Sequence, residues 1–312
     1  MTMFRSTFAR RHWLASLIAA AAVTLLATRV ADAQQSFKSP EDAAAALAAA
    51  VKSGDAEAMV KVLGPDAAEI VDSGDSVADA DLRQRFLAAF DGKHSLNIDG
   101  DKKAALILGP DDFPFPIPLI RNGSGWKFDT AAGRREILYR RIGRNELDAI
   151  QTSLAYVDAQ NDYADKNPAG AGRGVYARRF LSSPGKKDGL YWPSEGDESP
   201  LGKLVADATA EGYKLGGEPQ PYHGYYYRVL TRQGPNAPGG ALDYVVDGKM
   251  IGGFGLVAYP AEYGNSGVMT FVVNHAGTVY QKDLGENTAA IAKRITAFNP
   301  DQTWKKVEIS SP

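Results

Sequence analysis

The chain has 312 residues, of which 44% are hydrophobic and 23% charged, and its 35 basic and 37 acidic side chains give a net charge of −2. This composition excludes a disordered or collagen-like chain, and the charge balance gives no electrostatic reason to expect nucleic acid as a partner. The lack of cysteine excludes disulfides, thiolate metal sites and a cysteine nucleophile. At about 150 residues per domain, the length predicts two domains.

Residues 1–33 have the features of an export signal. Arg5, Arg10 and Arg11 form a basic start, residues 14–27 are apolar, and residues 31–33 offer the small-x-small pattern that signal peptidase cuts. The apolar run is shorter than the roughly 20 residues that a membrane-spanning helix needs. We therefore expect a periplasmic protein without a transmembrane segment, whose mature chain has 31 basic and 36 acidic side chains.

The export route stays open between two alternatives. Residues 10–14 read RRHWL, which has the outline of a twin-arginine signal. Arg29, just before the expected cleavage site, is unusual for the general secretory (Sec) route. The same arginines would also serve as the ordinary basic start of a Sec signal.

Residues 34–132 are predicted to form an N-terminal α+β domain. A helix should begin at Ser39 and Pro40 and end at Gly54, a second should cover residues 55–63, and a third should run from Asp79 or Asp81 to residue 92. Strand-like runs follow at residues 95–98, 104–108, 115–120 and 126–129. Short helices before a curled antiparallel sheet resemble the cystatin or nuclear-transport-factor-2 type of cone. Prolines at 114, 116 and 118 favour an edge strand.

Residues 133–312 are predicted to form a C-terminal α+β domain in which a long helix packs on an antiparallel sheet. Leu147, Ile150, Leu154 and Val157 recur at helical spacing and predict a helix over residues 145–163. A shorter helix should follow residues 199–200. Strands are expected at residues 222–231, 242–246, 250–259, 268–274 and 278–282, and a closing helix at 287–298.

Six strings of the chain are distinctive. They read RRIGRNEL at residues 140–147, DGLYWP at 188–193, PYHGYYYR at 221–228, YVVDGKM at 244–250, PAEYG at 260–264 and VYQKDLG at 279–285. With these strings the chain resembles a bacterial family known as domain of unknown function 2950, over nearly its whole length after the leader. The resemblance implies an exported protein of Gram-negative bacteria and brings no established activity.

The order of elements in residues 145–285 is also similar to the globular head of type IV pilins and pseudopilins. In those heads an amphipathic helix precedes a loop with Tyr and Gly and an antiparallel sheet that ends in a hairpin, here residues 266–280. Pilins carry a hydrophobic assembly helix at the N-terminus, whereas this chain has a whole domain there. The resemblance therefore implies a related binding domain that does not polymerise as pilins do.

The strand predicted around residues 222–228 contains the candidate catalytic residues. Alternation along a strand would place His223, Tyr225 and Tyr227 on one face, and Tyr222, Tyr226 and Arg228 on the other. An imidazole with two phenols and a nearby acid could form a general acid/base site. The alternative is a structural role, because tyrosines favour strands and bury their rings.

Aromatic residues are dense in the C-terminal half and could form a Tyr-rich binding face. Together with one arginine, the candidate ligand-binding residues are Tyr191, Trp192, Tyr222, Tyr226, Arg228 and Tyr244. If they are exposed together, they would bind an envelope protein, a peptide or a glycan. If they are buried, they form the core.

Other classes of site find little support in the sequence. The histidines at 94, 223 and 275 lack metal-binding spacings, so we expect no metal, and no motif indicates a cofactor or a serine nucleophile. An arginine cluster, residues 134, 135, 140, 141 and 144, could receive an acidic partner or phosphate. It could equally form a solvated face with Glu136 and Glu146, or an interdomain hinge.

The sequence thus favours a periplasmic binding or assembly-support module without enzymatic activity. The alternative is a hydrolase or lyase of an envelope polymer, with His223 as general base and Tyr225 or Tyr227 orienting it.

Overall fold

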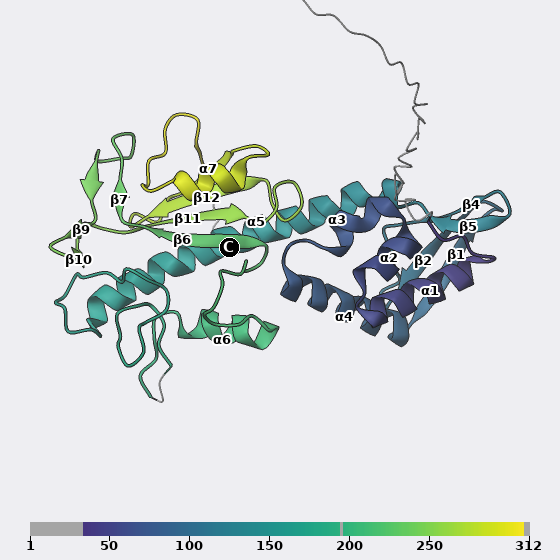
Figure 1. Ribbon diagram of the computed structural model, residues 1–312, viewed down its shortest axis with the longest axis horizontal. Helices are drawn as coiled ribbons and strands as arrows, with labels where there is room; N and C mark the ends of the chain where they lie inside the picture. Colours follow the sequence, from purple (N-terminus) through teal and green to yellow (C-terminus); the bar gives the residue numbers. More distant parts are fainter. Residues whose placement is uncertain (1–33, 194–195, 309–312) are drawn as a thin grey trace, which may run out of the picture. The chain divides into compact units, whose positions relative to one another are not determined.

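The computed structural model describes residues 34–193 and 196–308 (Figure 1). The predicted leader, residues 1–33, lies outside the described residues. Within the described part of the chain, no helix is long and apolar enough to cross a membrane.

Short helices open the described chain: α1 (Pro40–Ser53), α2 (Ala56–Leu63), the 3-10 turn η1 (Pro65–Ala67), α3 (Ala68–Val71) and α4 (Ser76–Gly92). The predicted start of α1 is confirmed, because the Ser39 side chain accepts a hydrogen bond from the backbone of Asp42. Helix α4 begins earlier than predicted. Its N-cap is Asp75, whose carboxylate accepts from the backbone N–H groups of Val77 and Ala78.

An antiparallel sheet follows these helices. Its strands are β1 (His94–Asp99), β2 (Lys103–Leu108), β3 (Phe113–Pro114), β4 (Leu119–Asn122) and β5 (Gly125–Phe128). The order is β1-β2-β4-β5, with the two-residue β3 paired to β2. The expected strand at 115–120 is shorter than predicted, because the prolines before residue 119 cannot donate to a ladder. The sheet and helices enclose a core that includes Leu47, Leu106 and Phe128.

Helix α5 (Thr130–Lys166) is much longer than predicted and begins 15 residues before Asn145. The predicted helix began only at residue 145, but both Gly133 and Gly143 lie within α5. A Cβ atom on Gly133 would lie 2.5 Å from the carbonyl oxygen of Pro116, so this glycine permits close packing and does not end the helix. The helix ends at Asn167, which takes a left-handed backbone conformation.

The apolar face predicted for α5 is confirmed in part: Val157 is buried and Ile150 and Leu154 pack against the core, but Leu147 does not. Leu147 is 63% exposed, and Ile150 and Leu154 are half-buried. The fully packed positions are smaller or polar residues and tyrosines, among them Ala149, Ser153, Tyr156 and Gln160. Small side chains let the helix approach the sheet closely, so hydrophobicity alone predicts only part of the contact face.

The C-terminal half contains α6 (Gly202–Glu211), β6 (Tyr225–Leu230), β11 (Gly255–Pro260), β12 (Met269–Asn274), β13 (Val279–Asp283), α7 (Thr288–Arg294) and β14 (Lys305–Lys306). The strands form one antiparallel sheet in the order β14-β13-β12-β11-β6. Short pairs join β7 (Arg232–Gln233) to β8 (Leu242–Asp243) and β9 (Val245–Val246) to β10 (Lys249–Met250). The predicted strand over residues 250–259 is therefore divided between β10 and β11.

Alternating residues of this sheet enter two hydrophobic clusters. Leu256, Ala258 and Phe271 belong to a cluster that also contains Tyr156 and Val157 of α5. Their neighbours Val257 and Val272 belong to a second cluster with Phe298. The described chain is thus an α+β protein with antiparallel sheets, as predicted. Helix α5 runs through the predicted boundary at residues 132 and 133, and the division into two domains stays a prediction.

Gln160 of α5 provides a test of the packing between this helix and the following loop. Its fully buried amide donates to the carbonyl of Ala177 and accepts from the N–H of Ala177, both at 2.8 Å. Gln160→Leu should lower the free energy of unfolding by about 2–4 kcal/mol, because both backbone groups lose their partner. Gln151→Leu, at an exposed position of α5, should change it by less than about 0.5 kcal/mol. Urea denaturation measures the free energy of unfolding of both variants. Equal losses would show that the hydrogen bonds between Gln160 and Ala177 do not stabilise the fold.

Candidate functional site

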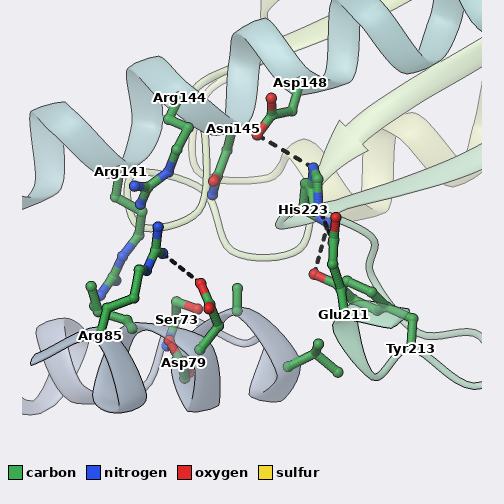
Figure 2. Close-up of a pocket in the computed structure, with 14 residues that line it drawn as sticks. Ser73, Asp79, Arg85, Arg141, Arg144, Asn145, Asp148, Glu211, Tyr213 and His223 are labelled. Atoms are coloured by element: carbon green, nitrogen blue, oxygen red, sulfur yellow. Dashed lines mark hydrogen bonds and ion pairs between the residues drawn. The ribbon is translucent and has the colours of Figure 1, made fainter. Parts of the chain in front are cut away.

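A cavity of about 370 Å³ opens between α4, α5 and the segments that follow α6 (Figure 2). We call it the charged cleft. Charged side chains line it on opposite sides: Arg85, Arg141 and Arg144 on one side, and Asp148, Glu211 and His223 on the other. Asp79 and Asp81 of α4 complete its charged groups.

His223 lies in a tight turn that leads into β6. Tyr222 and Tyr225 pair as an isolated bridge, and the two residues between them have positive φ angles, 49° at His223 and 74° at Gly224. Positive φ at both central residues is the mark of a type I′ hairpin turn. A Cβ atom on Gly224 would lie 2.5 Å from the amide nitrogen of Asn145, so glycine lets the turn approach α5.

The turn changes the expected grouping of residues. His223 precedes the strand, so it does not share a strand face with Tyr225 and Tyr227. The Tyr225 hydroxyl donates to the carbonyl of Met269, 2.9 Å away, and the Tyr227 hydroxyl is buried beside Thr152. Burial raises the pKa of both phenols. The structure therefore does not bring the hydroxyl of Tyr225 to His223.

The imidazole of His223 instead lies between two carboxylates. Its Nε2 is 2.6 Å from Oε2 of Glu211 and its Nδ1 is 3.3 Å from Oδ2 of Asp148 (Figure 2). The ring of Tyr222 stacks on it at 4.1 Å. Burial alone would lower the pKa of His223, but the hydrogen bonds to the two carboxylates outweigh burial and raise the pKa. Because both ring nitrogens face acceptors, this arrangement favours the imidazolium, in which both nitrogens donate.

Asp75 fixes the turn against the start of α4. One oxygen of this buried carboxylate caps the helix, and the other accepts from the backbone N–H of Gly224 at 2.8 Å and from the Tyr213 hydroxyl at 2.9 Å. The Tyr213 oxygen in turn accepts from the backbone N–H of His223. Burial and the nearby charge of Asp75 raise the pKa of Tyr213, so the phenol stays protonated and donates.

Arg141 fixes the opposite side of the cleft. It is buried and donates to the carbonyls of Glu69 and Ile70 and to the side chain of Asn265. Burial lowers its pKa, and the nearby carboxylate of Asp79 opposes this shift. Burial raises the pKa of Asp79 itself, while one of its oxygens accepts from the backbone N–H of Ser73 at 3.0 Å.

The other two arginines of the cleft have different surroundings. Arg85 pairs with Asp81 at 2.6 Å. Arg144 is exposed, points into the cleft in Figure 2, and has no hydrogen-bond or ion-pair partner among the described residues. The predicted arginine cluster is therefore divided, because Arg140 pairs with Glu136 on the surface, as expected for a solvated face, while Arg141 and Arg144 enter the cleft.

The aromatic candidates lie mainly in the core. Tyr225 and Tyr244 are fully buried and Trp192 is 5% exposed, whereas Tyr191 and Tyr226 are half-buried. The remaining candidate, Arg228, donates to the carbonyls of Ala292 and Ile295 at the end of α7. Of the candidate site residues, His223 lines the charged cleft and Tyr222 stacks beside it.

The comparison with protein families agrees with the resemblance seen in the sequence. The family described as protein of unknown function (DUF2950) matches residues 34–307. The chain belongs to this family. Searches of curated proteins and of solved structures found no similar chain. The similarity to pilin heads stays a prediction.

Sequence reasoning named Arg144 in the arginine cluster but missed Asp75, Asp148 and Glu211 as residues of the same site. The spacing of Arg144 and Asp148 by four residues on a helix was the available signal, since such residues are neighbours on the helix surface. Nothing in the sequence places Asp75 and Glu211 beside them. The described residues contain no cluster of three or more His, Cys, Asp or Glu side chains able to hold a metal ion.

Asp75 should contribute much more stability than an ordinary helix cap. Asp75→Ala should lower the free energy of unfolding by about 3 kcal/mol, because it removes the cap of α4 and leaves the Gly224 N–H and the Tyr213 hydroxyl without their acceptor. Asp55→Ala removes an exposed cap at α2 and should cost about 1 kcal/mol. Chemical denaturation measures both variants. A loss no larger for Asp75→Ala than for Asp55→Ala would show that the bridge to the turn contributes little.

The pKa of His223 should lie above its ordinary value of 6.5 in the folded protein. The charged ring therefore contributes stability that is complete below pH 6.5 and is lost as the pH rises through the folded-state pKa. Two-dimensional NMR of the imidazole should give a midpoint above 6.5, and Glu211→Gln should lower it, because one charged acceptor becomes neutral. The stability difference between wild type and His223→Gln should shrink over the same rise in pH. A midpoint at or below 6.5 would contradict the assignment.

Proposed function

We propose that this protein is exported to the periplasm and binds a small polar ligand in the charged cleft. The observation that carries the proposal is the guanidinium of Arg144, which points into a cavity without a partner among the described residues. A guanidinium can hold a carboxylate or phosphate through two parallel hydrogen bonds, so an arginine that points into a concave site is an anchor for such a ligand.

The rigidity of the surrounding groups supports a binding site. Asp75, Arg141 and Asn145 are all buried and hydrogen-bonded: Asp75 connects α4 to the turn at His223, and Arg141 and Asn145 connect α5 to the loop at residues 265 and 266. A site whose walls are fixed before the ligand arrives loses little conformational entropy on binding. The cavity volume also lies at the lower end of the range for small-molecule sites, which fits a ligand of metabolite size.

The sequence predicted a Tyr-rich binding face, whereas the ligand is now assigned to the charged cleft. Tyr225 and Tyr244 are fully buried and cannot offer an aromatic surface, while Tyr222 and Tyr213 lie beside His223 at the cleft. A ligand bound here is compatible with an assembly-support role that involves an envelope protein, peptide or glycan. It is also compatible with a pilin-like ancestry of the C-terminal sheet.

The alternative is a hydrolase or lyase with His223 as general base, and the position of His223 in a concave site favours it. A general base needs a free lone pair, however, and both ring nitrogens of His223 face carboxylate oxygens. This arrangement favours the protonated ring, which cannot accept a further proton. Binding fits this geometry better than base catalysis does.

The proposal is tested with protein produced from the full-length coding sequence and isolated from the periplasmic fraction. We expect an N-terminus at residue 34 and, in native mass spectrometry, a bound small molecule that dissociates on denaturation. Arg144→Ala should abolish the adduct, whereas Arg135→Ala, at an exposed position of the same helix, should retain it. Recovery from the cytosol with residues 1–33 attached would overturn the export proposal. An adduct unaffected by Arg144→Ala would overturn the assignment to this cleft.

A further inference from the structure

The two sides of the charged cleft carry opposite excess charge. The side formed by α4 and the first part of α5 has three guanidinium groups and two carboxylates, those of Asp79 and Asp81. It therefore carries at least one excess positive charge, and more when the buried Asp79 is protonated. The other side has two carboxylates, Asp148 and Glu211, around one imidazole. Even with a charged His223, this side carries one excess negative charge.

Arg144 and Asp148 would be expected to neutralise each other, since they lie four residues apart on α5. The carboxylate of Asp148 instead turns to Nδ1 of His223, 3.3 Å away. This contact leaves Arg144 without a partner in the described chain and separates the two charges along the cleft. The position of His223 thus holds the Asp148 carboxylate on its own side of the cleft.

The start of α4 cannot serve as the anion site. The Asp75 carboxylate already accepts from the N–H groups of Val77 and Ala78, and these are the groups that would otherwise face an anion. Arg141 likewise donates to two carbonyls and an amide oxygen. Arg144, with Arg85 nearby in Figure 2, is therefore the group left to hold an anion.

We propose that the charged cleft binds a small zwitterion, of dipeptide size, with its carboxylate on Arg144 and its ammonium group on Asp148 and Glu211. This inference rests on the function proposed above and names the class of ligand. A guanidinium holds a carboxylate through two parallel hydrogen bonds, and an ammonium group offers three donors to the carboxylates beside His223.

A simple anion fits the cleft less well than a zwitterion does. An anion bound to Arg144 would leave the excess negative charge at Asp148 and Glu211 uncompensated about one helical turn away, roughly 6 Å along α5. A cation bound there would leave Arg144 uncompensated. Extended chain spans about 3.5 Å per residue, so the two ends of a dipeptide match this separation.

Isothermal titration calorimetry at low salt tests the inference with alanyl-alanine and two blocked analogues. N-acetyl-alanyl-alanine lacks the ammonium group, and alanyl-alanine amide lacks the carboxylate. We expect wild type to bind alanyl-alanine and each analogue to bind about tenfold more weakly or worse, because each loses a charge-assisted contact. This part of the test needs no variant and is independent of folding.

Variants then assign each end of the ligand. Arg144→Ala should weaken alanyl-alanine binding about tenfold and remove the difference between alanyl-alanine and its amide. Glu211→Gln should reduce the difference between alanyl-alanine and its N-acetyl form, and Arg135→Ala should bind like wild type. Circular dichroism melting confirms that each variant is folded.

Each remaining outcome overturns the inference. Equal binding of the N-acetyl form would indicate an anion site, and equal binding of the amide a cation site. No heat with alanyl-alanine at millimolar concentration, or an Arg144→Ala protein that matches Arg135→Ala, would exclude this class of ligand. The function proposed above is tested separately, by the molecule that co-purifies with the protein. A bound molecule that is not a zwitterion would support ligand binding in the cleft but contradict the class of ligand proposed here.

Discussion

The arrangement of the site depends on the carboxylate of Asp75. A capping side chain usually accepts hydrogen bonds only from the first turn of its helix. The Asp75 carboxylate also accepts from the backbone N–H of Gly224 and from the hydroxyl of Tyr213. Four donors, three backbone N–H groups and one phenol, fix this buried carboxylate in place. The start of α4 and the turn before β6, which are about 150 residues apart in sequence, are thereby fixed to each other.

Helix α5 supplies the second constraint, because it contributes to both sides of the cleft. Arg141, Arg144 and Asp148 follow one another at three- and four-residue intervals and so lie along one strip of the helix. The helix is held at this strip by Asn145, whose amide donates to the carbonyl of Ser266, and by Glu146, which accepts from the backbone of residues 268 and 269. Because α5 is fixed beside Arg144, this arginine extends into the cleft without a partner of its own among the described residues.

The sequence allowed much of the local structure to be predicted and little of the site. Helix caps, turns and alternating strands depend on neighbours in the chain, so α1, α2 and the hairpin of β12 and β13 followed from residue patterns. The start of α5 did not, because the apolar spacing used to predict this helix begins only at Leu147, whereas the helix begins at Thr130. His223 was selected as a candidate because imidazole titrates near neutral pH, but the structure gives it other neighbours than the strand alternation predicted. Its positive φ angle places it in a turn, and Asp148 and Glu211 reach it from two helices.

The polar character of this region argues for a role beyond folding. Burying Asp75, Asp79, Arg141 and Asn145 requires the removal of their hydration, and well-packed apolar residues would often join the same elements at least as stably. The two hydrophobic clusters elsewhere in the C-terminal half show that the chain uses apolar packing where only cohesion is needed. Polar and charged groups that hydrogen-bond to one another, by contrast, fix the orientation of each side chain as well as its distance from its neighbours. Around the charged cleft they fix the backbone that carries Arg144 on one side and the His223 turn beside the carboxylates on the other, and this separation of charge is what a ligand with two opposite charges requires.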